Sequence, residues 1–592
     1  MSSPTNLLVK PIRFNTGLNL ILGRYSGDKT EHGINGIGKS SLVRLIDYLL
    51  ISETAERRFL EPKYDFLRNE HHQVCLDLEI RGQEIRIRRE FQENQHVFIR
   101  REGESEYSYR KDEAKRILGT LFFPTDSVRQ LPGERYRSLM QFFLKDDLNT
   151  QRRVDPISFV THGGANKQEL FSLNLFLLGL PNNPLIIFGE KQALLKNKRK
   201  EQKTIIDQVE NSTGKPLAEL KTDLSARQKE IDTLQKSLGK FELTEDFRMV
   251  SETIADIANK IANLRKILEQ TDHQISRFRK FTNSSREIIV ADIAEQYELV
   301  QSSFGELVRR RLDEVIAFRE SLVQARLVFH DKRIRELETL RKSSFDELME
   351  LEKQRSFLLR QIEEKNTNIS MRDAFERFAL KQVEFERIRH AVSDVANMDQ
   401  ELSQMEMQIE EARRDTFQAI NSVEESIRSI QELFVEIIEK AIGLTTPGER
   451  EGAYLDITTL HGRRRNSIPV LIEVQIPRND ALGHARLSLV VYDLTVFFHS
   501  IDSEIPNPRF LIHDGVFHAI ARRTVVRTLN YIFQRSQENP TFQYIVTFNE
   551  DEISATQTEQ ERDGRFEFDI DQVTILKLSD HPDHMLFKRQ FL

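Results

Sequence analysis

The chain has 592 residues, which suggests roughly three to five domain-sized units. Charged residues make up 30% of it and hydrophobic residues 39%, a balance expected where a long helical section is solvated. The formal net charge of −7 neither requires nor excludes a nucleic-acid partner, whereas the single cysteine, Cys75, excludes an intramolecular disulfide and a zinc site built from cysteines. No apolar run reaches about 18 residues, so we expect a cytoplasmic protein that does not enter a membrane.

Residues 1–188 have the pattern of the first half of an α/β domain, with short apolar runs between glycines and prolines. Residues 74–80 alternate between apolar and polar side chains. Residues 84–88 alternate in the same way after a short polar link, and the pair predicts a β-hairpin.

The most specific motif of this half is a complete G-x-x-x-x-G-K-S phosphate loop that ends at Ser40. An apolar run at residues 18–23 precedes it and a helix-like run at residues 41–46 follows it, which is the context that phosphate binding needs. We expect Lys39 to contact the β- and γ-phosphates of ATP and Ser40 to place its hydroxyl on Mg²⁺. The residues expected to bind the nucleotide here are Gly33, Asn35, Gly36, Gly38, Lys39, Ser40 and Ser41.

Residues 189–440 change in character, because Glu, Lys, Arg, Gln and Leu dominate and Pro216 is the single proline. Counted from Leu402, apolar residues recur at heptad positions over five heptads, which predicts a coiled coil. The a positions are Leu402, Ile409, Thr416, Val423, Ile430 and Ile437, and the d positions are Met405, Ala412, Ala419, Ser426 and Leu433.

A single helix over this whole segment would be far longer than usual, so we expect two antiparallel arms joined through a turn region near residues 240–300. Residues 239–245 and 282–286 are the candidate turns, because they carry glycine, asparagine and serine. A compact helical bundle is the alternative interpretation.

Residues 441–592 return to an α/β pattern, with strands expected at residues 470–476, 510–512 and 544–548 and an apolar helix at residues 485–498. Asp514 follows the second of these strands and is the best candidate for the carboxylate that holds Mg²⁺ beside a phosphate loop. Lys39 and Asp514 lie 475 positions apart (514 − 39), so one nucleotide site would be split between the two ends of the chain.

This layout resembles ABC ATPases of the SMC and RecN kind, and more narrowly an uncharacterised family of SMC-like ATPases from bacterial ABC three-component operons. The segments that carry the narrow resemblance are residues 136–139, 318–326, 492–494 and 512–514. The resemblance implies an α/β P-loop ABC-type ATPase head formed from both chain ends and interrupted by a long antiparallel α-helical coiled coil. It also implies a homodimer through the heads, double-stranded DNA as a partner, and an effector protein (a nuclease or another activity) encoded nearby in a mobile or defence locus.

The chain departs from this family pattern at the position of the general base. ABC ATPases usually carry a glutamate directly after the metal-binding aspartate, and here that position is Gly515. A general base must reach the attacking water within about 3 Å, or through one further water. The candidate substitutes are His513, His518 and Glu550, with a structural role beside the strand as the alternative for His513. Hydrolysis is expected to be slow or activated by a partner.

Three other family positions are also altered. The usual Ser-Gly-Gly of the signature loop is absent, and residues 479–483 stand in its place. Gly483 is expected to permit a close backbone approach there, and an ordinary loop is the alternative interpretation. Asn549 occupies the switch position after the last strand, where many relatives carry histidine. Gln141 is the candidate for the loop that senses Mg²⁺ in the N-terminal half.

Clustered arginines are candidates for contacts to DNA phosphates. They are Arg86, Arg88 and Arg89; Arg100 and Arg101; Arg309, Arg310 and Arg311; and Arg463, Arg464 and Arg465. Ordinary solvated surface is the alternative for each cluster.

The leading hypothesis is an ATP-gated machine that senses or clamps DNA and signals to an effector in bacterial defence against phages or mobile elements. A DNA-repair ATPase of the RecN kind is closely related to it. From a different class comes a scaffold that holds ATP with little or no turnover, which Gly515 motivates.

Overall fold

The computed structural model of the chain divides into two compact units. The head unit comprises Met1–Asn197 and Ser403–Leu592, and the helical unit comprises Lys198–Leu402. The structure describes residues 1–25, 36–92, 95–131, 135–146, 155–160, 167–239, 253–268, 270–272, 274–275, 332–358, 369–460, 467–477, 482–554 and 557–589.

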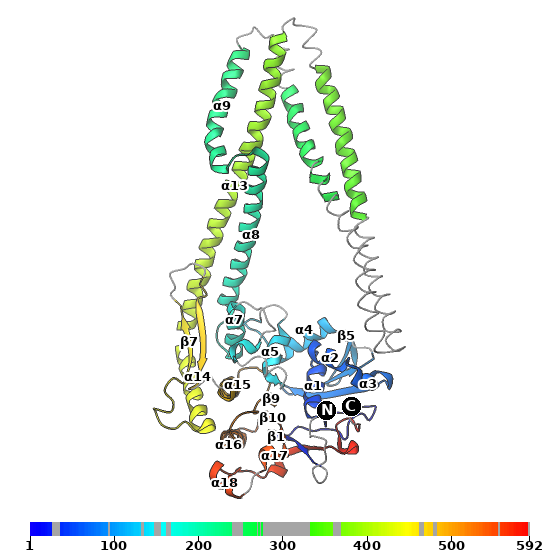
Figure 1. The fold of residues 1–592 in the computed structure, drawn as a ribbon, viewed down its shortest axis with the longest axis vertical. Coiled ribbons are helices and arrows are strands. Elements are labelled where there is room, and N and C mark those ends of the chain that lie inside the picture. The colour runs from blue at the N-terminus through cyan, green and yellow to red at the C-terminus, as the bar shows by residue number, and fades with distance from the viewer. Residues whose placement is uncertain are drawn as a thin grey trace. The chain divides into compact units, whose positions relative to one another are not determined.

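The main sheet of the head unit is parallel and five-stranded, in the order β11-β1-β10-β9-β6. Its strands are β1 Gly17–Arg24, β6 Leu144–Lys145, β9 Phe510–Asp514, β10 Gln543–Asn549 and β11 Thr574–Ser579. β1 is buried along nearly its whole length, as expected of an inner parallel strand. Because β1 lies between β10 and β11, this sheet is built from both ends of the chain (Figure 1).

A second, antiparallel sheet lies in the N-terminal half of the head unit. Its strands are β2 Gln73–Ile80, β3 Gln83–Glu90, β4 His96–Arg101 and β5 Tyr107–Arg110, paired in that order. β2 and β3 confirm the predicted hairpin. The two turn residues, Arg81 and Gly82, have φ values of 53° and 73°, as a two-residue type I′ turn requires.

The helices of the head unit cover both sheets and supply many of its buried apolar side chains. They are α1 Lys39–Leu49, α2 Glu53–Phe59, α3 Asp65–Asn69, α4 Lys111–Phe122, α5 Tyr136–Phe143, α7 Lys167–Leu177, α14 Glu424–Ile437, α15 Leu482–Asp502, α16 Arg522–Glu538, α17 Glu550–Ile553, α18 Gln557–Asp563 and α19 Ile570–Val573. The predicted apolar helix is confirmed as α15, whose residues 488–498 are all buried. The predicted strand at residues 470–476 is confirmed as β8 Val470–Gln475, which pairs with β7 Tyr454–Thr459.

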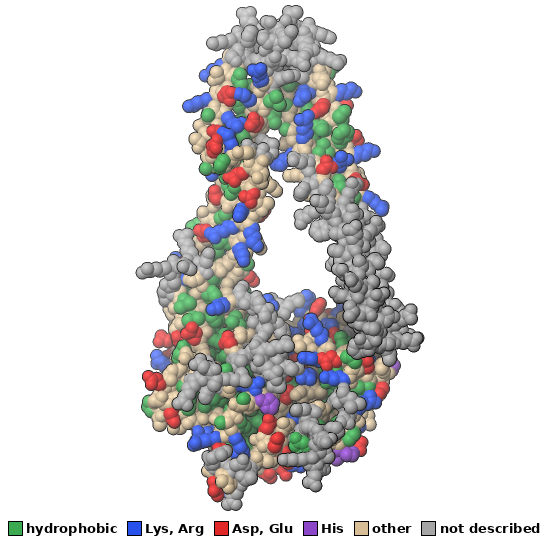
Figure 2. All heavy atoms as spheres, in the orientation of Figure 1, with side chains coloured by type: hydrophobic (Ala, Val, Ile, Leu, Met, Phe, Trp, Pro, Cys, Tyr) green, Lys and Arg blue, Asp and Glu red, His purple; other side chains and the backbone are tan. Residues whose placement is uncertain are grey.

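The helical unit contains helices that pair in antiparallel fashion. α9 Leu217–Gly239 pairs with α13 Ile369–Asn421, because Arg227 contacts Glu384 at 2.7 Å while Glu230, further along α9, contacts Lys381, which precedes Glu384. α8 Asn183–Thr213 pairs with α13 in the same sense, because Lys198 contacts Glu401 while Gln202, further along α8, donates to Asp399, which precedes Glu401. Figure 2 shows Lys and Arg side chains interspersed with Asp and Glu side chains along these helices, on the face that it draws.

A second antiparallel pair joins the helical residues 253–268 to the helix at residues 332–358. Ile257, Ile261, Leu264 and Leu348 form its buried apolar cluster. The ion pairs Arg265–Glu352 and Arg341–Asp272, both at 2.6 Å, fix its antiparallel direction. The first candidate turn, residues 239–245, begins at Gly239, where α9 ends, and its other residues lie outside the described residues. The second candidate turn, residues 282–286, lies entirely outside them.

The heptad pattern correctly predicts helix, but the prediction of one continuous seam through Ile437 is wrong. α13 ends at Asn421 and α14 begins at Glu424. Ser426, a predicted seam position, is exposed, and Ile427 is buried instead. The break has a physical reason, since α14 packs on α15 and β7 of the head unit rather than on a partner helix of the coil. Among the described residues, no helix combines the length and apolar character needed to cross a membrane.

Candidate functional site

The phosphate loop leads directly into the first helix of the head unit. Gly33 and Asn35 lie outside the described residues; from Gly36 onward the loop is described. Gly36 and Gly38 have φ values of 100° and 109°, and α1 begins at Lys39. A Cβ on Gly38 would lie 2.4 Å from the Cβ of Leu586, so this position requires glycine for both conformation and space.

The helix α1 is fixed at its other end by α5. The guanidinium of Arg137 donates to the carbonyl of Leu50 at 2.9 Å and pairs with Asp47, and the Tyr136 hydroxyl donates to the same carbonyl at 3.3 Å. These hydrogen bonds satisfy the carbonyl oxygen of Leu50, the C-cap residue of α1. Residues 136–139, which carried part of the family resemblance, therefore position the helix that bears Lys39 and Ser40.

Residues from both ends of the chain meet at the N-terminus of α1. The Nζ of Lys39 donates to the Oδ1 of Asn549 at 2.5 Å. The side chain of Ser40 lies beside the carboxylate of Asp514 and stabilises its charge. Ser41 is buried, and its hydroxyl lies 3.2 Å from the hydroxyl of Tyr64. The structure thus brings together the phosphate loop, the end of β9 and the end of β10, as the split-site hypothesis requires.

Asp514 is buried, with 2% of its surface exposed, and only partly satisfied by the described residues. Its Oδ1 accepts a hydrogen bond from Thr547, while its Oδ2 lacks a partner with hydrogen-bond geometry there, although Ser40 lies next to the carboxylate. Burial raises the pKa of Asp514, against the opposing effect of the Thr547 and Ser40 hydroxyls. A buried carboxylate oxygen beside a serine hydroxyl is the kind of donor set that Mg²⁺ prefers, so these residues fit that ion.

The Lys39 ammonium is also partly removed from water. Burial lowers its pKa, while the nearby carboxylates of Asp514, Glu552 and Asp551 oppose that change. A phosphate group bound at Lys39 would add negative charge beside the ammonium and strengthen the same stabilisation.

The candidate magnesium sensor, Gln141, does not lie at the carboxyl end of a strand. It lies in α5, ahead of β6, and its side-chain oxygen is buried without a partner among the described residues. β6 runs parallel to β9 with Lys145 opposite His513, so the residue level with Asp514 is Asp146. Asp146 lies 3.7 Å from the guanidinium of Arg44 on α1. Sequence analysis missed Asp146 because a two-residue strand has no periodic pattern.

His513 points away from the phosphate loop, since successive side chains of a strand face opposite sides of its sheet. Its Nε2 lies 3.1 Å from Asp493, and its Nδ1 lies 2.8 Å from the hydroxyl of Tyr544. Lys145 pairs with the other oxygen of Asp493, and all these side chains are buried. Both ring nitrogens are engaged in this buried cluster, so the structure does not place His513 beside the phosphate loop.

Gly515, at the position where ABC ATPases carry glutamate, has a φ of 67°. A glutamate would be strained there, since L-residues avoid this left-handed conformation. The loop that follows contacts Gly483, at which a Cβ would lie 2.5 Å from the carbonyl oxygen of Ala519. Gly483 therefore lies close to the backbone of another loop in the same head unit. Residues 479–481 lie outside the described residues.

The two glutamates of α17 have different surroundings. Glu550, a candidate base, pairs with Arg24 at 3.0 Å, and 39% of each side chain is exposed. Glu552, which the sequence analysis did not select, accepts the backbone N–H of Asn549 at 2.7 Å and lies 3.0 Å from Nδ1 of His518. An asparagine followed three residues later by glutamate is a capping-box spacing, which was the available sequence signal.

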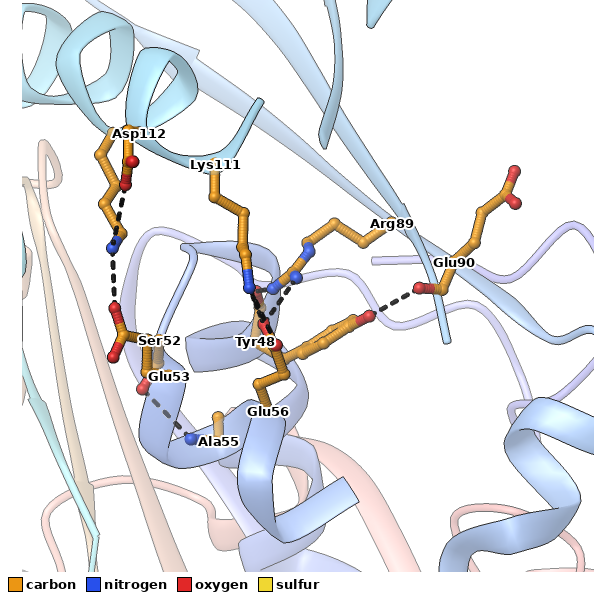
Figure 3. Close-up of polar contacts among 10 residues, drawn as sticks. Tyr48, Ser52, Glu53, Ala55, Glu56, Arg89, Glu90, Lys111 and Asp112 are labelled. Carbon is orange, nitrogen blue, oxygen red and sulfur yellow. Dashed lines mark hydrogen bonds and ion pairs between the residues drawn. The ribbon is translucent and has the colours of Figure 1, made fainter. Parts of the chain in front are cut away.

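One member of the first arginine cluster, Arg89, is internal, which corrects its interpretation as part of a DNA-binding patch. Arg89 is fully buried, stacks on the Tyr48 ring at 3.8 Å and donates to Glu56 at 3.0 Å. Figure 3 shows Arg89 and Lys111 pointing toward Glu56, which accepts from both. A buried, paired guanidinium cannot reach a DNA phosphate.

The other members of the arginine clusters differ in exposure. Arg86 pairs with Asp77 at 2.5 Å, and Arg88 pairs with Glu106 at 2.7 Å. Arg100 and Arg101 are exposed on β4. The clusters at residues 309–311 and 463–465 lie outside the described residues.

Comparison with known proteins gives limited matches. The model of a family described as "Uncharacterised protein conserved in bacteria (DUF2326)" matches residues 430–591. No curated protein matches the chain. A crystal structure of the Smc head domain with a coiled coil and joint from Pyrococcus yayanosii is similar at a TM-score of 0.37 and 14% identity, covering 90% of this chain and 88% of that one.

An Smc head domain with an extended coiled coil from Pyrococcus furiosus, solved with the C-terminal domain of ScpA, is similar at a TM-score of 0.30 and 12% identity. That similarity covers 91% of this chain and 85% of the other.

Proposed function

We propose that this chain binds Mg·ATP in the head unit and hydrolyses it as an SMC-like ATPase. The observation that supports this most directly is the meeting of Lys39 and Ser40 with the buried, partly unsatisfied carboxylate of Asp514. Lys39 binds the β- and γ-phosphates, and Ser40 and Asp514 hold Mg²⁺. The bound Mg²⁺ neutralises phosphate charge, and the amide of Asn549 hydrogen-bonds a γ-phosphate oxygen.

The wider proposal follows the family resemblance. Two heads dimerise by enclosing ATP, with the Gly483 loop of one head contacting the nucleotide of the other. The dimer senses or clamps double-stranded DNA and signals to an effector in defence against phages or mobile elements. The exposed Arg100 and Arg101 support the DNA part, because arginines on an accessible strand can bind phosphates without reading sequence.

ATP turnover by the purified protein, with and without duplex DNA, tests the proposal. The wild-type protein is expected to hydrolyse ATP, and Lys39→Ala is expected to abolish both turnover and ATP binding. Lys221→Ala, at an exposed lysine of α9 in the helical unit, is the matched control. Wild-type protein that binds no ATP would refute the proposal, and light scattering that shows no ATP-dependent change in mass would refute head dimerisation.

A scaffold that holds ATP without turnover is the second candidate function. The left-handed backbone at Gly515 favours it, because that backbone disfavours the usual catalytic glutamate. Tight ATP binding with turnover no faster than that of Lys39→Ala, with or without DNA, would support the scaffold over the ATPase.

A further inference from the structure

We propose that His518, oriented by Glu552, accepts the proton of the attacking water during ATP hydrolysis. The proposal rests on the proposed ATPase function and supplies the base that Gly515 cannot. The two residues lie on different elements, His518 in the loop after Asp514 and Glu552 in α17 after β10.

The carboxylate of Glu552 is held by two hydrogen bonds. Its Oε2 accepts the backbone N–H of Asn549 at 2.7 Å, and its Oε1 lies 3.0 Å from Nδ1 of His518. Burial alone would raise the pKa of Glu552, but the hydrogen bonds from His518 and Asn549 hold it below its ordinary value. Glu552 is therefore an anionic partner for the imidazole rather than the proton acceptor itself.

The position of His518 is also fixed through its backbone. Its carbonyl accepts a hydrogen bond from Arg486 at 2.7 Å, which ties the loop to α15. With Nδ1 bearing the proton that Glu552 accepts, the imidazole takes the tautomer in which Nε2 is the basic nitrogen. A carboxylate that orients a histidine in this way is a recurring arrangement for general-base catalysis.

Asn549 connects this pair to the phosphate end of the site. Its backbone N–H contacts Glu552 at 2.7 Å, and its side-chain oxygen accepts from Lys39 at 2.5 Å. The charge of Glu552 also acts on the Lys39 ammonium, which places the two groups near one another. Glu552, the partner of His518, thus lies near the lysine expected to bind the γ-phosphate.

In the proposed step, the oxygen of a water attacks the γ-phosphorus while Nε2 of His518 takes one water proton. The bond between that phosphorus and the bridging oxygen of the β-phosphate breaks, and ADP and inorganic phosphate are the products. Glu552 stabilises the imidazolium that forms, and no further reactant is needed.

The test compares side-chain replacements in the full-length protein. His518→Asn keeps an N–H donor near the Nδ1 position and removes Nε2, so turnover is expected to fall about 100-fold, the lower end of the range for losing a general base. ATP affinity, measured with a fluorescent analogue, is expected to change less than about twofold. His581→Asn, at an exposed histidine in a different loop, is the matched control.

A spectroscopic measurement tests the orientation without relying on activity. In protein labelled with ¹⁵N-histidine, the imidazole signals of His518, assigned through His518→Asn, are expected to show the tautomer protonated at Nδ1. Glu552→Gln is expected to weaken that preference and to lower turnover at least tenfold. Glu550→Gln tests the competing carboxylate of the same helix.

Each failure points to a different part of the proposal. Wild-type protein that hydrolyses ATP while His518→Asn retains its rate would overturn the role of His518 and leave the ATPase function standing. A larger loss in Glu550→Gln than in Glu552→Gln would also overturn it. Wild-type protein that binds no ATP would refute the proposed function itself.

Discussion

The Nζ of Lys39 donates a hydrogen bond to the Oδ1 of Asn549 across 2.5 Å, although 510 residues separate the two in the chain. This contact joins the phosphate loop of the N-terminal half to the last residue of β10 in the C-terminal half. The proposed nucleotide site therefore forms only when the two halves of the head unit are docked.

Replacing Asn549 with aspartate is expected to weaken ATP binding about tenfold. Asn549→Asp places a carboxylate beside Lys39, where it competes for the ammonium and repels the incoming phosphates. Titration with a fluorescent ATP analogue measures the change. Asn539→Asp, in an exposed loop where the side-chain oxygen accepts from Thr541, is the control. An affinity within twofold of wild type would contradict the assignment of Asn549 to the phosphate site.

Substituting Gly515 is expected to destabilise the head unit without accelerating hydrolysis. Gly515→Ala and Gly515→Glu should each lower the free energy of unfolding by about 1–2 kcal/mol, because an L-residue at a φ of 67° is strained. Urea denaturation measures this loss. Gly448→Ala is the control, since its φ lies outside the left-handed region and its added Cβ meets no atom within 4 Å. Faster ATP turnover in Gly515→Glu would show that the loop can accept the usual base.

Removing the ammonium of Lys145 is expected to be strongly destabilising. Lys145→Met leaves the buried carboxylate of Asp493 facing His513 alone, a change that typically costs about 3–5 kcal/mol. The double variant Lys145→Met/Asp493→Asn should recover part of that loss, because the remaining amide carries no charge. Urea denaturation of the two single variants and the double variant gives the coupling energy. Additive losses would contradict the ion-pair explanation.

Stability is expected to fall as the pH drops below about 6.5, in part through His499 on α15. Burial lowers the pKa of His499, against the opposing effects of a backbone hydrogen bond at Leu178 and of the Asp502 carboxylate. The unfolded chain, with a histidine pKa of about 6.5, then binds more protons than the folded chain. Melting temperatures between about pH 7.5 and 5.5 measure this loss. His499→Gln should flatten the curve and His581→Gln should not, and an unchanged slope in His499→Gln would contradict the prediction.

Much of the head could be predicted from the sequence because its signals are local. The hairpin of β2 and β3, the helix α15 and the inner strands β9 and β10 have clear patterns within a few residues. The phosphate loop and Asp514 were found in the same way. The prediction of a continuous heptad seam was wrong because α14 packs on α15 and β7 of the head unit rather than on a helix of the coil. A repeat pattern does not show which element a helix packs against.

The rest of the candidate site depended on contacts that sequence patterns do not contain. Glu550 and Glu552 are both glutamates directly after β10, so the residue type does not separate their roles. Their contacts do, because Glu550 pairs with Arg24 and Glu552 with His518. Similarly, the sequence does not distinguish Arg89 from the other arginines of its basic run. Its buried role follows from its contacts with Glu56 and Tyr48. Long-range pairing of charges therefore decided these roles.

The order of the main sheet has a consequence for synthesis of the protein on the ribosome. β1 pairs only with β10 and β11 in this sheet, and its register with β10 joins Gly17 to Gln543. At about 5–20 residues per second, the roughly 500 intervening residues take roughly half a minute to two minutes to translate. During that time the apolar β1 has neither neighbour strand, so the nascent chain is expected to need a chaperone. The proposed nucleotide site can form only after Asp514 and Asn549 have been translated.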